Sequence, residues 1–198
     1  MTTKILIINR ALTKLGSERL MSETDNNAAS RAIEAVYDGV LDNLLRVYRW
    51  SFAIKRAALP ALVEKPVHGY QFEYQLPADC LRIDMVTDNI HHDWRCEWHM
   101  PVPRYQVEGR KILADIESPL YLRYGARMTD PSIYDSAFAE AFACALAVEI
   151  CESITQSSTK KQAALQAYTT AISQARQVSA IERPPIQQQE TSWYTSRL

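Results

Sequence analysis

The densest group of side chains able to bind a metal ion lies at residues 91–99, HHDWRCEWH. Histidine and cysteine are ligands that zinc prefers, but a structural zinc site needs four ligands that converge as a tetrahedron. On a strand, Cys96 would share a face with Trp94 and Trp98, whereas His99 would point to the opposite face. The spacing therefore favours a loop followed by a half-buried strand, and we expect neither a metal nor a cofactor.

Two of the four cysteines, Cys144 and Cys151, lie seven residues apart within an alanine-rich segment. Side chains at that spacing share one face of a helix. A nucleophilic thiol needs an oriented histidine beside it, and a serine hydrolase would carry a GxSxG turn, which the sequence lacks. Core packing is therefore the favoured role of both thiols. Since Cys80 and Cys96 complete the set without any CxxC pair, we expect reduced thiols and no disulfide framework.

Five carboxylates fall on segments with helical periodicity: Glu34, Asp38, Glu140, Glu149 and Glu152. Di-iron proteins place such residues inside a helical bundle, but they also need Glu-x-x-His on two of the helices. All four histidines lie between residues 68 and 99, outside these segments. Solvated helix faces therefore explain the carboxylates, and we expect no catalytic residue among them.

Basic and aromatic side chains alternate over residues 46–56, RVYRWSFAIKR, and in isolation could form a nucleic-acid-binding patch. The whole chain lends no support, because 22 Lys and Arg oppose 23 Asp and Glu. Cations also favour the C-terminal end of a helix, so the sequence favours a helix end that leads into a strand. With five glycines and neither a GxGxxG nor a GxxxxGK[ST] motif, a nucleotide-binding enzyme is not indicated.

The N-terminal part of the chain has the apolar spacing of two amphipathic helices. The first covers residues 3–15, with Thr2 or Thr3 as N-cap and Gly16 just after its end. The second follows the capping residues at 25–27 and extends to about Tyr48.

Two further helices are predicted after residue 129. Asp130 and Pro131 are suited to the N-cap and first position of the third helix, which continues through the alanine-rich run 136–154. The fourth helix starts after Ser157 or Ser158 and must stop before Pro184. Its predicted buried seam, with nearly coiled-coil spacing, consists of Leu165, Tyr168, Ile172, Ala175 and Ser179.

Between residues 50 and 125 the apolar period changes from 3.6 to 2, which indicates β-structure. The clearest alternating runs are 70–76, 81–85, 94–100 and 120–124, and prolines and glycines mark turns between them. This spacing predicts an antiparallel meander of five to seven short strands.

The predicted fold class is α+β, with a four-helix bundle split in sequence by an antiparallel β-sheet insertion. The helical bundle domain would comprise residues 1–49 and 126–182, and the β-sheet domain residues 50–125. Residues 183–198 would form an extended C-terminal arm, because Pro184, Pro185 and a run of glutamines leave little to bury. We expect Ile186, Trp193 and Tyr194 to anchor this arm on a partner, since Trp and Tyr dominate binding hot spots. Packing back onto the parent domain stays open as the alternative.

No apolar run approaches the ~18 residues that suggest a membrane-spanning helix. Asn9 and Arg10 also interrupt the apolar N-terminal stretch, so it lacks the pattern of a signal peptide. We therefore expect synthesis in the cytoplasm and no membrane contact.

Five segments carry a resemblance to a known family. They are residues 50–59 (WSFAIKRAAL), 74–82 (YQLPADCLR), 108–115 (EGRKILAD), 118–124 (SPLYLRY) and 129–135 (TDPSIYD), the last followed by the alanine-rich helix. In order and spacing the chain resembles the head-to-tail adaptors, or tail tubular A proteins, of short-tailed bacteriophages. The resemblance covers most of residues 1–180, none of its motifs is catalytic, and the C-terminal arm matches no motif of the family.

The resemblance implies a structural protein of the virion rather than an enzyme. It would form a ring, typically of twelve copies, at the head-to-tail junction, between the portal protein and the nozzle or tubular proteins of the tail. Genomic DNA would pass through the lumen during ejection without sequence-specific binding. A near-neutral chain suits this role, because each retained phosphate contact would add affinity and friction.

Two other classes of function stay open. A small cytosolic enzyme would use Cys144, Cys151 or residues 91–99, and rapid thiol labelling or a retained metal would identify it. A DNA-binding regulator would use residues 46–56, and its affinity for duplex DNA would fall steeply with salt.

Overall fold

The computed structural model describes residues 2–22, 25, 27–88 and 104–182. These residues form a mixed protein of four α-helices and two small antiparallel sheets. The chain divides into two compact units. The first contains Met1–Lys55, Ala78–Ile83 and Tyr124–Glu182, and the second contains Arg56–Pro77 and Asp84–Arg123.

The first two helices begin and end where their capping residues predict. Helix α1 (Lys4–Leu15) starts after Thr3, whose side chain accepts a hydrogen bond from the amide of Leu6 at 3.3 Å. It ends at Gly16, which has a φ of 67° and returns its amide to carbonyls of the last turn. Glycine adopts this left-handed conformation without the steric cost that a β-carbon imposes. Helix α2 (Ala28–Val47) is capped by Asn27 in the same way.

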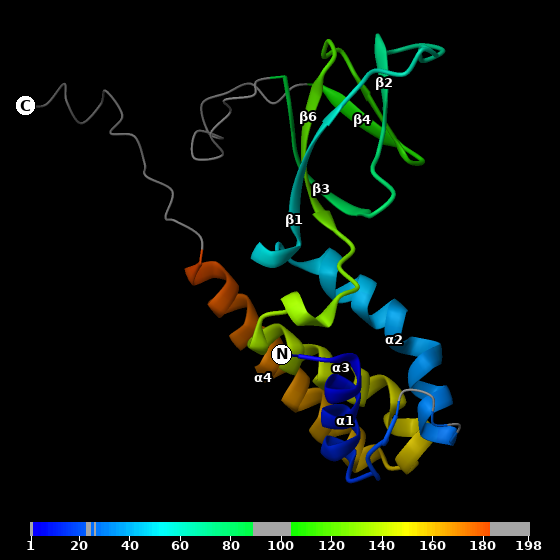
Figure 1. The fold of residues 1–198 in the computed structure, drawn as a ribbon, viewed down its shortest axis with the longest axis vertical. Helices are drawn as coiled ribbons and strands as arrows, with labels where there is room; N and C mark the ends of the chain where they lie inside the picture. Colours follow the sequence, from blue (N-terminus) through cyan, green and yellow to red (C-terminus); the bar gives the residue numbers. More distant parts are fainter. Residues whose placement is uncertain (1, 23–24, 26, 89–103, 183–198) are drawn as a thin grey trace, which may run out of the picture. The chain divides into compact units, whose positions relative to one another are not determined.

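The central element of the first unit is α3 (Ser136–Thr155), which contacts α1, α2 and α4 (Figure 1). Residues 141–147 are buried without interruption. A helix that is apolar around its whole circumference cannot lie at a surface, and small alanines let three neighbours approach it closely. Phe138 and Phe142 form an aromatic cluster with Trp50, which lies shortly after α2. The ring centroids of Trp50 and Phe138 are 4.9 Å apart.

The expectation that Asp130 and Pro131 open α3 was wrong. They begin a separate single turn of 3-10 helix, Pro131–Ile133, in which the Asp130 carboxylate accepts a hydrogen bond from the Ser132 amide. Helix α3 starts only at Ser136, after Asp135 in a non-helical conformation. The capping signal was correct, but the turn that it stabilises ends before the alanine-rich run begins.

Helix α4 (Ser158–Ile181) packs on one side only. Its buried positions are Ala164, Ala171, Ala175 and Ser179, and the first three belong to the hydrophobic core around α3. The predicted seam was correct for Ala175 and Ser179, and Tyr168 and Ile172 are partly buried against the same core. Leu165 is 50% exposed, and the seam passes through Ala164 instead. Small side chains at these positions allow the two helices to approach closely, which a leucine would prevent.

The β-structure forms two three-stranded sheets rather than the single meander predicted. One sheet has the strand order β2 (Phe72–Gln75), β5 (Lys111–Ala114), β4 (Tyr105–Glu108), with both pairs antiparallel. The other has the order β1 (Ile54–Leu59), β6 (Leu120–Ala126), β3 (Cys80–Thr87). A meander pairs sequence neighbours, whereas here the first described strand pairs with the last. The boundary between the two units falls within β1, β3 and β6.

None of the helices in the described part of the chain is both long and apolar enough to cross a membrane.

Candidate interaction surfaces

Two sequence-predicted candidates lie outside the described residues. These are the histidine-rich segment 91–99 and the C-terminal arm with Pro184, Pro185, Ile186, Trp193 and Tyr194. Within residues 2–88 and 104–182, apart from the short gaps near residue 25, no cluster of three His, Cys, Asp or Glu side chains could hold a metal ion.

Cys144 and Cys151 are both buried on α3, as the seven-residue spacing predicted. The Cys151 thiol lies 3.3 Å from the Thr155 hydroxyl. Burial raises the pKa of the Cys144 thiol, and the nearby Lys14 ammonium offsets this only in part. Since the thiolate is the nucleophile, a raised pKa suits a structural thiol and not an activated one.

Three of the five carboxylates considered for metal binding, Asp38, Glu140 and Glu152, form ion pairs on separate surfaces. Glu140 accepts a hydrogen bond from Lys14 at 2.5 Å, and Arg10 lies 3.8 Å from its other oxygen. Asp38 pairs with Arg127 at 3.2 Å, and Arg127 also donates to Asp42 at 2.6 Å. This arrangement ties the chain after β6 to the side of α2.

The aromatic residues of segment 46–56 belong to the packing of the first unit. Trp50 is buried and its indole donates to the carbonyl of Leu44 at 2.7 Å. Phe52 stacks against Trp50 and meets Phe138 edge to face. Lys55 is paired with Asp79 at 2.7 Å. Rings engaged in this way are not exposed for stacking with nucleic-acid bases.

A groove of about 440 Å³ runs beside α4 in the first unit. Its α4 side is lined by small and uncharged side chains, and Lys14 of α1 with Glu140 and Cys144 of α3 complete it. The α4 residues that line it are Ala163, Gln166, Ala167, Thr170, Ala171 and Gln174. The interval between Lys161 and Arg176 contains no charged residue at all. Depletion of charge is the compositional mark of the core of a protein interface.

The C-terminal end of α4 is fixed to the segment that follows α2. The Tyr48 hydroxyl donates to the carbonyl of Arg176 at 3.1 Å, and the Ser51 amide donates to the Ser179 hydroxyl at 3.3 Å. The Ser51 hydroxyl donates to the Glu182 carboxylate. These contacts hold the end of α4, up to Glu182, beside residues 48–51.

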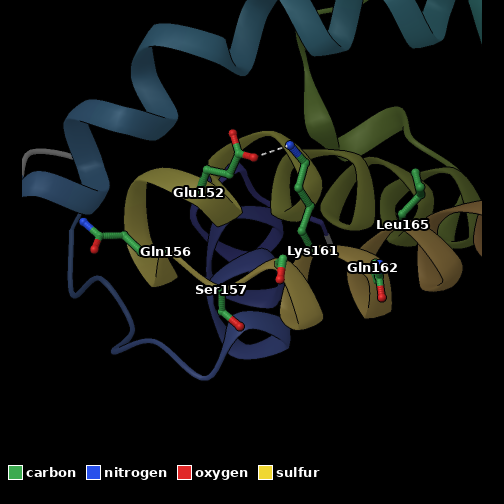
Figure 2. Close-up of a pocket in the computed structure, with 7 residues that line it drawn as sticks. Glu152, Gln156, Ser157, Lys161, Gln162 and Leu165 are labelled. Carbon is green, nitrogen blue, oxygen red and sulfur yellow. Dashed lines mark hydrogen bonds and ion pairs between the residues drawn. The ribbon is translucent and has the colours of Figure 1, made fainter.

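A second depression, of about 590 Å³, lies at the turn between α3 and α4. Figure 2 shows Glu152 and Lys161 facing each other there, with their charges 2.6 Å apart, and Leu165 at the α4 side. The α4 residues of this depression include Gln162 and Leu165, neither of which lines the 440 Å³ groove. The helical period places them on a different side of α4 from the groove residues. Glu152 and Lys161 are the charged residues of this lining and they pair with each other, so the described lining offers no unpaired charge for a ligand.

The second unit exposes apolar side chains on the loop between β1 and β2. Val63 is 100% exposed and Val67 is 99% exposed. The loop is held at its base, where the Leu62 amide donates to the Glu73 carbonyl at 2.8 Å and Ala61 bridges to Tyr74. Two fully exposed valines on an anchored loop suit contact with another protein, since buried aliphatic side chains stabilise an interface.

The sequence predicts these surfaces only in part. The uncharged interval of α4 can be read directly from the sequence, but the groove beside it requires Lys14 and Glu140 from two other helices. The valine loop carries no motif beyond its prolines. Among the described residues, these surfaces are suited to protein contact. No protein-family model and no curated protein matches the chain.

Proposed function

We propose that this chain is a structural head-to-tail adaptor of a short-tailed bacteriophage, which joins the portal protein to the nozzle or tubular proteins of the tail. The observation that carries the proposal is that each compact unit has its own exposed uncharged or apolar surface. These are the groove side of α4 in the first unit and the Val63–Val67 loop in the second. A protein that joins two partners needs two such surfaces.

The resemblance over most of residues 1–180 supports the same function, with its expected ring of about twelve copies and passage of genomic DNA through the lumen. Under this proposal the four helices act as the bundle that forms the ring wall. The C-terminal arm, through Ile186, Trp193 and Tyr194, attaches to the portal or to the neighbouring subunit when the ring docks. The near-neutral net charge of −1 is compatible with DNA that slides past.

The test is the native mass of the full chain, alone and after mixing with the portal protein encoded in the same genome. We expect a complex that saturates at one adaptor chain per portal chain. An adaptor that never joins the portal at any mixing ratio would refute the proposal.

A truncated chain, residues 1–182, separates the role of the arm from that of the folded units. We expect this chain to join the portal at least about tenfold more weakly, the factor that corresponds to the loss of one aromatic anchor. Unchanged affinity would remove the arm from the docking surface but leave the adaptor function intact.

A further inference from the structure

On one side of α4, the exposed residues between Ala163 and Ile181 are uncharged, and this side ends where residues 183–198 begin. Six residues at spacings of three or four lie on one side of the helix, and all six are exposed: Ala163, Ala167, Thr170, Gln174, Val178 and Ile181. We call them the 163–181 face. The first four line the 440 Å³ groove, and Ile181, 83% exposed, closes the face at the end of the helix.

From this geometry we infer that, in the isolated protein, the 163–181 face and its groove are a docking site for the chain's own residues 183–198. Helix α4 ends at Ile181, and the hydrogen bond from Ser51 to Glu182 fixes the last residue before the arm. The sequence that follows contains Pro184 and Pro185, which disfavour a helix. Ile186 follows four residues after Glu182, close enough to cover Val178 and Ile181. The three glutamines that come next are suited to the uncharged Thr170 and Gln174.

The length of the arm matches the distance to the groove. Trp193 lies eleven residues beyond Glu182. An extended chain of this length reaches up to roughly 36 Å, whereas Ala167 lies about 22 Å back along the helix axis. The extended chain is therefore longer than the distance that the indole must cover. The excess length allows the chain to reverse its direction after the end of the helix. In the groove, the indole would lie beside the Lys14 ammonium, a cation that favours an aromatic face.

The occupant is the chain's own arm because attachment gives that arm an effective concentration in the millimolar range, which a second copy or another protein does not have. If the adaptor proposal is also correct, the portal or a neighbouring subunit would displace the arm from α4 upon docking. That consequence rests on the proposed function, whereas the docking of the arm in the isolated chain does not.

Cleavage by chymotrypsin after Trp193 and Tyr194, followed by mass spectrometry of the full chain under native conditions, tests the inference. We expect Ala167→Glu, which puts a charge into the groove, to accelerate this cleavage about tenfold relative to the natural chain. Its matched control is Thr169→Glu, exposed on the same helix but outside the 163–181 face, which should leave the rate unchanged. Equal rates in all three proteins would overturn the inference.

A second pair of variants with opposite charge distinguishes blocking of the face from a specific effect of a carboxylate. Gln174→Lys should release the arm as Ala167→Glu does, and Ser173→Lys should not. Both sites are exposed, and circular dichroism would confirm that the helix content is retained. A natural cleavage rate in either 163–181 face variant would refute the docking site.

The dependence of the cleavage rate on protein concentration shows whether the chain's own arm or a second copy covers the 163–181 face. Protection by the chain's own arm is independent of protein concentration, so the cleavage rate per molecule should stay constant over roughly a hundredfold dilution. Protection that disappears on dilution would assign the face to a second copy and overturn the inference. Because these assays contain no portal protein, their failure would leave the adaptor proposal untouched, and failure to bind the portal would not affect their result.

Discussion

At the residue scale, a hydrogen-bonded group at the start of β3 makes the stability of the first unit depend on pH. The Tyr124 hydroxyl donates to Asp79 at 3.1 Å, and Lys55 donates to the other oxygen of the same carboxylate. Burial would by itself raise the pKa of Asp79, but the hydrogen bonds from Lys55 and Tyr124 outweigh it and lower that pKa. For Tyr124, burial and the Asp79 carboxylate act together and raise the pKa to about 12.

An alkaline decline in stability follows from the Tyr124 shift. The folded chain holds the phenol proton more tightly than the unfolded chain, in which tyrosine titrates near pH ~10. The resulting stabilisation is complete below that pH and is lost as the pH rises to about 12. Urea unfolding at a series of pH values should therefore show a falling free energy of unfolding in this window, and Tyr124→Phe should reduce the fall. An equally large fall in the variant would contradict the assignment.

The thiol of Cys144 gives a second prediction at this scale, and it bears on the enzyme alternative. Because burial raises its pKa, alkylation of Cys144 at about pH 8 should be much slower than that of an exposed thiol. Lys14→Met should slow it further, since the ammonium is one of the groups that lower the pKa. Peptide mass spectrometry after timed labelling measures both rates. Rapid alkylation of Cys144 would reopen a nucleophilic role.

At the element scale, the close contact between α3 and α4 depends on small side chains. Ala175 is fully buried in this contact, whereas Ala180 of the same helix is exposed. Ala175→Leu should lower the free energy of unfolding by about 1–3 kcal/mol, because the added carbons have no space. Ala180→Leu is the matched control and should change it by less than about 0.5 kcal/mol. Equal effects in denaturant unfolding would show that the contact tolerates larger side chains.

At the scale of the whole molecule, the adaptor proposal requires the second unit to take part in a protein contact as well. Replacing Val63 and Val67 by serine removes the fully exposed apolar tips of the β1–β2 loop without touching buried residues. We expect this double variant to fold normally and to lose affinity for one of the two proposed partners, portal or nozzle, measured by native mass. Val107→Ser, at a half-exposed site on β4, is the control and should bind both. Natural binding of both partners by the loop variant would exclude the loop as a docking surface.

The sequence by itself determined the elements whose signals are local. Thr3, Asn27 and Gly16 stabilise helix ends through groups within a few residues of themselves, so their roles could be predicted without any tertiary contact. The apolar run of α3 likewise predicts a buried helix, because no surface position could accommodate it. The burial of Cys144 follows from its place in that run, and the burial of Cys151 follows from the seven-residue spacing that puts both on one face of the helix.

Only the tertiary structure decided which elements pair and which faces stay exposed. The pairing of β1 with β6 joins residues more than sixty positions apart, and alternation along a strand is the same whichever neighbour it has. The shift of the α4 seam from Leu165 to Ala164 depends on the shape of α3, which the periodicity of α4 does not contain. The groove needs Lys14, Glu140 and Ala167 from three helices. Side chains brought together from distant segments leave no joint pattern in the sequence, because each segment satisfies its own local geometry first.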